Sequence, residues 1–305
     1  MKRKLVKQGV RALTITLPSS WIQKNNLSAG DEIELEEIDN VLLVSTDNVQ
    51  TAKEITVDMS GFLPRLADRF LARAYQKGYD KIIVKFDDPQ IMVVLKQKVP
   101  ELLGNEILHT TKNTLEIQVI SQHLDLDFDV LLRRGILLLL DMSETCYNAW
   151  KTTDIAALKN IFEQDYDVNR FMYFCLRHLN KTTQRASFGR SILYYLIESL
   201  EDLGDELKKL SLLLAATKSD PHVLVLLKQV NTMFRLSYDF FYKPDKTKAT
   251  EAFTLYQQIS ASVDTLFEKK KDPRLMKALL KIQSISNIIY HLTTMRLDTL
   301  KELGG

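Results

Sequence analysis

The chain has 305 residues, of which 45% are hydrophobic and 26% charged, and its formal net charge is +2. This length predicts two or three compact units, and the composition is ordinary for a soluble globular protein. Cys146 and Cys175 show no CxxC spacing, which argues against a disulfide framework and against a zinc site. The most apolar run, residues 135–140, is too short to span a membrane, and no secretory signal opens the chain. We therefore expect a soluble cytoplasmic protein.

Charge is distributed unevenly at the N-terminus. Residues 1–30 contain no acidic residue, and residues 31–40 contain no basic one. The basic residues of the first segment are Lys2, Arg3, Lys4, Lys7, Arg11 and Lys24. This separation predicts a local basic surface that the small net charge of the whole chain conceals.

Residues 2–46 alternate between apolar and polar side chains with a period of two. This pattern predicts short strands at 13–17, 33–36 and 41–44. Pro18 begins a short helix over 18–24, because the first turn of a helix tolerates proline. Turns are expected at 28–31 and at 39–40, where Asp39-Asn40 suits a tight hairpin.

The N-terminal segment resembles the AbrB/MazE/SpoVT family of swapped-hairpin domains. The resemblance lies in Arg3 to Gly9, Leu13 to Pro18, Trp21, Leu27 and Gly30 to Leu35, with the Leu-Pro and Gly-Asp turns at the family's spacing. It implies that two chains interleave their hairpins into one small β-barrel and so form a homodimer. Size agrees, because roughly 50 residues are marginal as an isolated fold. We assign residues 1–50 to this domain.

DNA binding is what the family resemblance implies for the basic cluster. Lysine and arginine contacts to phosphates supply most of the non-specific affinity for DNA. Arg3, Lys4 and Lys7 are the best candidates, and Arg11 lies beside the basic position that usually follows the glycine in the family. Ser19 and Ser20 stand where the family has a second basic cluster, which puts base-specific readout in doubt. The alternative is that these charges complement the acidic stretch and that the domain serves dimerisation or protein binding alone.

Residues 51–122 alternate strand and helix and predict a small α/β domain. Strands are expected at 55–57, 81–86, 107–109 and 115–120, and helices at 63–77 and 89–103. The role that the sequence suggests for this domain is to orient the flanking domains.

Residues 125–303 predict an all-α domain of six long helices. Helical breaks fall near 152–154, 180–189, 220–221, 244–246 and 272–273. An offset of 95 aligns the first two helices with the fourth and fifth, and an offset of 82 aligns the third with the sixth. We interpret this as two tandem three-helix bundles, about 125–217 and 220–303. The alternative is that any two amphipathic helices align apolar on apolar.

An acidic motif lies on the third predicted helix. Glu201 and Asp205 are four residues apart, so both carboxylates leave one face of that helix. The sequence Leu200-Glu201-Asp202-Leu203-Gly204-Asp205 resembles the Leu-Glu-Arg-Ile-Gly-Asp signature of PhoU proteins. The stretch from Asp165 to Asn169 is similar to a motif in that family's second helix. With the N-terminal domain, the arrangement resembles an archaeal-type phosphate uptake regulator.

The PhoU resemblance implies regulation of phosphate transport, with metal bound on the acidic face in some members. Asp165, Glu201 and Asp205 would form one site for a divalent or ferric ion in the first bundle, because oxygen ligands suit hard cations. The repeat places Ser260, Gln283 and Asn287 at the equivalent positions, so the second bundle is not expected to bind metal. The alternative is a solvated acidic face without metal.

Enzyme motifs are absent from the sequence. There is no GxxxxGK[ST], GxGxxG, GxSxG or HExxH pattern, so we expect a non-enzymatic protein. The sequence predicts a DNA-binding transcriptional regulator of phosphate uptake that responds to a phosphate transporter ATPase or a sensor kinase. The alternative is an adaptor that inhibits a phosphate transporter and uses the N-terminal barrel only to dimerise. An antitoxin is less favoured, because antitoxins normally end in a short disordered toxin-binding tail.

Overall fold

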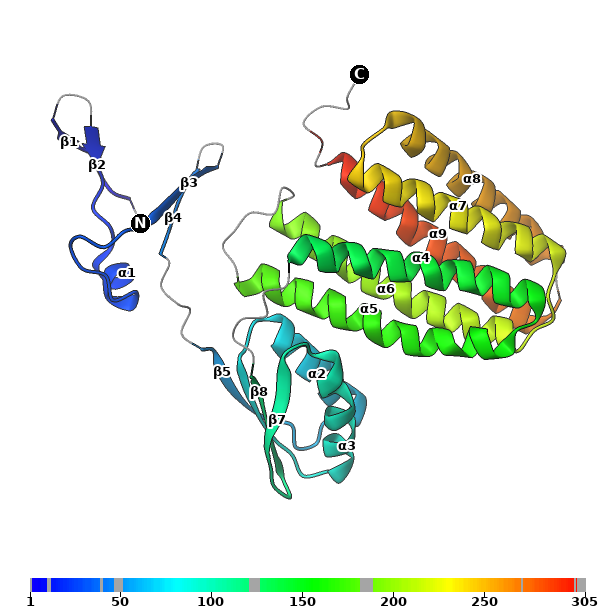
Figure 1. Cartoon of the computed structure of the whole chain (residues 1–305), viewed down its shortest axis with the longest axis horizontal. Helices are drawn as coiled ribbons and strands as arrows, with labels where there is room; N and C mark the ends of the chain where they lie inside the picture. Colours follow the sequence, from blue (N-terminus) through cyan, green and yellow to red (C-terminus); the bar gives the residue numbers. More distant parts are fainter. Residues whose placement is uncertain are drawn as a thin grey trace. The chain divides into compact units, whose positions relative to one another are not determined.

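The computed structural model divides the chain into two compact units, Met1–Ala52 and Lys53–Gly305. Each is described by itself (Figure 1). The residues described are 2–9, 12–38, 41–46, 52–120, 127–181, 189–269, 271–298 and 300.

The N-terminal unit consists of two hairpins and one short helix. Strand β1 (Val6–Gln8) pairs antiparallel with β2 (Ala12–Thr14), and β3 (Glu34–Ile38) pairs antiparallel with β4 (Val41–Ser45). Helix α1 (Ser19–Lys24) follows Pro18 as expected. Gly30 has a φ of +101°, and the Ser28 amide donates to the Asp31 carboxylate at 2.7 Å, which closes the expected turn. The predicted turn at 39–40 lies outside the described residues.

The described residues of a single copy of this unit form no buried hydrophobic core. Its exposed apolar side chains are 53% to 63% accessible and lie on and around the strands: Leu5, Val6, Leu13, Ile15, Leu35 and Leu42. In the described part of this single chain the hairpins form two separate two-stranded sheets. The barrel built from two chains therefore stays a prediction.

The second unit begins with an α/β part. Its sheet has the order β5 (Glu54–Asp58), β6 (Lys81–Lys85), β8 (Thr114–Val119), β7 (Asn105–Thr110). The β5–β6 pair is parallel, and the other two pairs are antiparallel. Helices α2 (Pro64–Gln76) and α3 (Pro89–Lys98) pack against the sheet. The predicted helix over 89–103 ends early, and residues Val99–Glu101 form the 3-10 turn η1, because Pro100 cannot continue an α-helix.

Six long helices form the rest of the second unit: α4 (Phe128–Thr152), α5 (Ile155–Lys181), α6 (Arg190–Ala215), α7 (Pro221–Tyr242), α8 (Lys246–Lys269) and α9 (Pro273–Leu297). Aspartates begin three of them. Asp127, Asp220 and Asp272 each accept hydrogen bonds from backbone amides of the first turn, which satisfies groups that lack helical partners.

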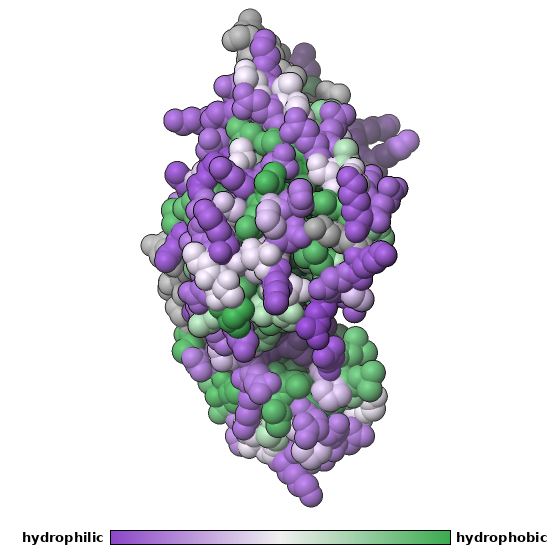
Figure 2. Space-filling model, turned by 90° about the vertical axis from the view of Figure 1, so that its right-hand side faces the viewer, coloured by the Kyte–Doolittle hydropathy of each residue, from purple (hydrophilic) through white to green (hydrophobic). Residues whose placement is uncertain are grey.

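The helices pack as two three-helix bundles, α4–α6 and α7–α9, which confirms the prediction from the sequence. The bundles meet through α6 against α9 and α4 against α7 (Figure 1). One hydrophobic core includes buried residues of both bundles. Hydrophobic residues on the face shown in Figure 2 are interspersed with hydrophilic ones. No helix in the described part of the chain is long and apolar enough to cross a membrane.

Polar contacts fasten the α/β part to the first bundle. The buried guanidinium of Arg177, on α5, donates to the carbonyl oxygens of Tyr75 at 3.0 Å and Tyr79 at 2.7 Å, and to the Asp80 carboxylate at 2.5 Å. It also lies 4.9 Å from the centre of the Tyr75 ring. The Lys181 ammonium donates to the same oxygen of Asp80. Because Arg177 satisfies three acceptors at once, it holds the end of α2 against α5.

Candidate functional site

The predicted DNA-contacting residues lie on the N-terminal unit. Arg3, Lys4 and Lys7 are exposed, and Arg11 lies outside the described residues. No ion pair joins these three cations to the described residues of the acidic stretch. Their predicted contact with DNA stays a prediction.

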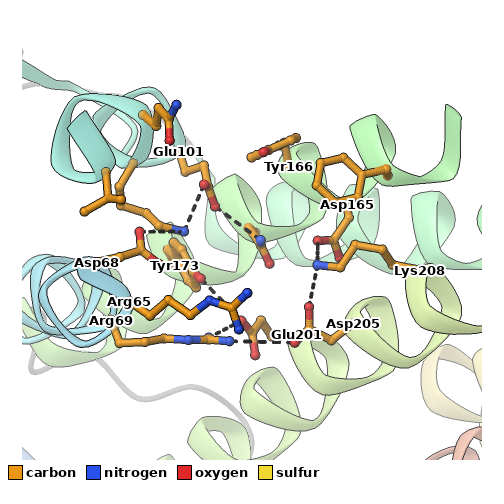
Figure 3. Close-up of a pocket in the computed structure, with 15 residues that line it drawn as sticks. Arg65, Asp68, Arg69, Glu101, Asp165, Tyr166, Tyr173, Glu201, Asp205 and Lys208 are labelled. Atoms are coloured by element: carbon orange, nitrogen blue, oxygen red, sulfur yellow. Dashed lines mark hydrogen bonds and ion pairs between the residues drawn. The ribbon is translucent and has the colours of Figure 1, made fainter. Parts of the chain in front are cut away.

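A charged cleft of about 270 Å³ lies between the α/β part and the first bundle. Helices α2 and α3 and the turn η1 supply one side of it, and α5 and α6 supply the other. Its charged residues are Arg65, Arg69, Lys98, Lys208, Asp68, Glu101, Asp165, Glu201 and Asp205. Figure 3 shows Arg69 directed toward Glu201 and Asp205, and Lys208 directed toward Asp165 and Asp205.

The structure brings the predicted metal ligands to this one cleft. Asp165 projects from α5, and Glu201 and Asp205 project from consecutive turns of α6. Asp165 and Glu201 are buried, at 3% and 8% exposure. The spacing of four residues in the sequence therefore predicted that Glu201 and Asp205 lie together on α6. The resemblance to the second-helix motif of PhoU proteins predicted that Asp165 joins them.

Two cations that the sequence did not single out lie between these carboxylates. The Lys208 ammonium hydrogen-bonds to Asp165 and, at 2.6 Å, to Asp205. The Arg69 guanidinium lies 3.4 Å from Glu201 Oε1 and 3.8 Å from Asp205 Oδ2. Each of the three carboxylates thus already has a positively charged partner (Figure 3).

Burial and these contacts act in opposite directions on the ionisation of the cleft. Burial raises the pKa of Asp165, although the hydrogen bond from Lys208 opposes the shift. Burial and the charge of Asp205 raise the pKa of Glu201. Burial also acts to lower the pKa of Lys208, but its hydrogen bonds to Asp165 and Asp205 outweigh this effect and the pKa is raised. The ammonium is therefore stabilised in its charged form by the two carboxylates.

Gly204 lets Asp165 approach α6. A Cβ atom at this position would lie 3.0 Å from Asp165 Oδ1 and 3.4 Å from Leu139 Cδ2. That carboxylate oxygen is buried and has no hydrogen-bond partner among the described residues. The glycine of the acidic signature thus accommodates the close contact between α5 and α6, where a Cβ atom would be tight, and the oxygen beside it is shielded from solvent.

A second polar group borders the cleft from the α/β side. Glu101, on η1, accepts hydrogen bonds from Lys98 at 2.9 Å and from the Asn169 amide at 3.2 Å. Burial raises its pKa, and Lys98 acts against that shift. Tyr173, on α5, donates its hydroxyl to Glu201 at 3.3 Å. No sequence signal links residues 65–101 to the acidic motif, because only the packing of α2 and η1 on α5 brings them together.

The side chains of Lys208 and Arg69 determine whether a metal ion fits among the three carboxylates. The three carboxylates are of the right chemical type for a hard cation. With Lys208 and Arg69 in place, however, no group of three or more acidic, histidine or cysteine side chains in the described residues has the geometry to hold one. With the side chains in this arrangement, the site does not fit a metal ion. Metal binding by Asp165, Glu201 and Asp205 therefore stays a prediction from the sequence.

The second bundle lacks the acidic residues, as its sequence shows. At two of the equivalent positions, the Gln283 side-chain amide donates to Asn287 Oδ1 at 2.8 Å, so two amides on consecutive turns of α9 hydrogen-bond to each other. Near them Tyr256 and Tyr290 stack with ring centres 4.5 Å apart. The charged cleft is therefore specific to the first bundle within the described residues.

Comparison with known proteins identifies the N-terminal unit. Residues 6–49 match the family model of the MazE antitoxin, described as antidote-toxin recognition. The N-terminal unit is MazE-like. This confirms the family expected for that part of the chain, and the match covers no residue of the second unit. None of the curated proteins matches the chain.

Among the solved structures, the crystal structure of PhoU from Pseudomonas aeruginosa is similar to the chain. The two are 18% identical, and the similarity covers 57% of this chain and 98% of that chain with a TM-score of 0.48.

Proposed function

We propose that this chain is a DNA-binding transcriptional regulator of phosphate uptake. The observation that carries the proposal is the match of residues 6–49 to the MazE family model. In support, Arg3, Lys4 and Lys7 are exposed on a segment that contains no acidic residue. Cations placed in this way bind DNA phosphates and release counterions.

Self-association through the N-terminal unit is part of the proposal. A set of strands with apolar faces more than half exposed gains stability only when another surface covers those faces. Leu13 and Leu35 are 61% and 60% exposed, and the unit contributes no described residue to a core. A second copy of the same unit supplies matching strands, and the dimer would present two basic clusters to the two strands of a duplex.

The helical bundles are proposed to receive the signal. The acidic signature at 200–205 and the two tandem three-helix bundles are the features that the sequence shares with PhoU proteins. On this basis the regulated process is phosphate uptake, and the partner is a phosphate transporter ATPase or a sensor kinase. The proposed role is regulatory and not enzymatic, and the proposed location is the cytoplasm.

A mobility-shift experiment on DNA upstream of the protein's own gene tests this function. The wild type is expected to retard the DNA at low salt, and the double variant Arg3→Ala, Lys4→Ala is expected to retard it less. Absence of retardation by the wild type at low salt would contradict DNA binding and leave the transporter-inhibiting adaptor as the better explanation. A dimer that forms normally without binding DNA would point to the same alternative.

A further inference from the structure

Lys208 stands where a metal ion would have to bind. Its ammonium lies within hydrogen-bond distance of Asp165, on α5, and of Asp205, on α6. Its side chain is 19% exposed and those of the two aspartates are 5% and 20% exposed, so the three groups are largely shielded from water. A cation that bridged Asp165 and Asp205 would occupy the volume of this ammonium.

The charges of the three carboxylates and their two cationic partners also indicate that Lys208 takes the place of a metal ion. Asp165, Glu201 and Asp205 together carry three negative charges, and Lys208 and Arg69 offset two of them. Without the Lys208 charge, two negative charges remain, which one divalent cation neutralises. With the Lys208 charge only one negative charge remains, so a divalent cation would leave an excess of one positive charge in a partly buried site, where charge interactions are stronger than in water.

We propose that Lys208 is a built-in counter-ion that competes with a divalent cation for Asp165, Glu201 and Asp205. The cleft then binds a hard divalent cation tightly only when the Lys208 ammonium is removed from between the two aspartates. These three residues offer carboxylate oxygens as ligands, so the cation is of the Mn²⁺ or Mg²⁺ type and not a thiolate-seeking one. This inference does not rest on DNA binding.

Manganese binding by the full-length protein tests the proposal. Protein purified without an affinity tag and freed of metal by a chelator is titrated with Mn²⁺, and free Mn²⁺ is measured by electron paramagnetic resonance. Lys208→Met is expected to bind one Mn²⁺ per chain about tenfold or more tightly than the wild type. Adding Asp165→Asn to Lys208→Met is expected to remove most of this gain.

Lys209→Met is the matched control. Lys209 is the next residue on α6, and its ammonium contacts Asp205 at 3.7 Å and Glu206 at 3.0 Å but does not contact Asp165. This variant removes the same charge without opening the place between the two aspartates. It is expected to bind Mn²⁺ with nearly the affinity of the wild type, and a gain equal to that of Lys208→Met would contradict direct competition.

Lys208→Gln covers the possibility that Lys208→Met does not fold. Glutamine keeps a hydrogen-bond donor on a slightly shorter side chain and removes the charge. Thermal unfolding gives a second readout, because a ligand that binds only the folded chain raises its melting temperature. Mn²⁺ is expected to raise the melting temperature of the Lys208 variant more than that of the wild type. Equal affinity for Mn²⁺ in the wild type and the Lys208 variants would overturn the proposal.

Discussion

Replacing Arg177 by alanine tests how the α/β part is held on the first bundle. The change removes two hydrogen bonds to backbone carbonyls and one to the Asp80 carboxylate. Removing one member of a buried ion pair costs about 3–5 kcal/mol, because the other charge remains without its partner. Asp80 keeps Lys181, so the cost lies near the lower end, and we expect the free energy of unfolding to fall by about 3 kcal/mol.

Urea unfolding followed by circular dichroism measures this decrease, and hydrogen exchange locates it. The amide hydrogens of α2 and of the adjoining strand β6 should exchange faster in the variant. Those of α9, which is remote from Arg177, should change less. Arg170→Ala is the matched control on the same helix, because Arg170 is 43% exposed and its ion pair within the described residues is with the neighbouring Asp167. That change should cost less than about 1 kcal/mol. If the free energy of unfolding falls no more for Arg177→Ala than for Arg170→Ala, Arg177 does not hold α2 against α5.

Two further predictions concern the ionisation of the cleft and self-association. Because burial raises the pKa of Glu101 above 4.5, the folded chain binds this proton more tightly than the unfolded chain, and the wild type loses stability as the pH rises through the raised pKa. The stability of Glu101→Gln relative to the wild type should therefore increase as the pH rises above 4.5 in urea unfolding, and a constant difference would exclude this shift. Leu13→Asp places a charge on a strand face that is 61% exposed in one copy, and light scattering should show a dimer for the wild type and a monomer for the variant, whereas an unchanged mass would exclude this surface as the dimer interface.

The helices were predictable from the sequence because their signals are local. Asp127, Asp220 and Asp272 begin helices, and the apolar residues recur at helical spacing between them. The repeat then indicated the division into two bundles. The end of α3 was predicted less accurately, because the apolar pattern continues through Pro100 while the backbone changes to a 3-10 turn.

Only part of the candidate site was predictable from the sequence, because several of its contacts join residues that are far apart in the chain. Glu201 and Asp205 lie on one helix face, so their proximity follows from spacing alone. Lys208 is three residues from Asp205, and this spacing would have allowed the pair to be found. The contacts of Arg69 and Glu101 with the first bundle depend on how α2 and η1 pack on α5 and α6, and one sequence contains no local signal for that packing.

The salt dependence of DNA affinity tests the proposed function most directly. Fluorescence anisotropy on a duplex at several salt concentrations gives the slope of log affinity against log salt, whose magnitude falls by about 0.9 for each phosphate that the protein no longer neutralises. The triple variant Arg3→Ala, Lys4→Ala, Lys7→Ala is expected to bind more weakly with a shallower slope. Removal of three exposed lysines from the helices, Lys159, Lys228 and Lys277, removes the same charge and should leave the slope unchanged. Equal slopes for the wild type and the N-terminal variant would contradict DNA binding by the MazE-like unit.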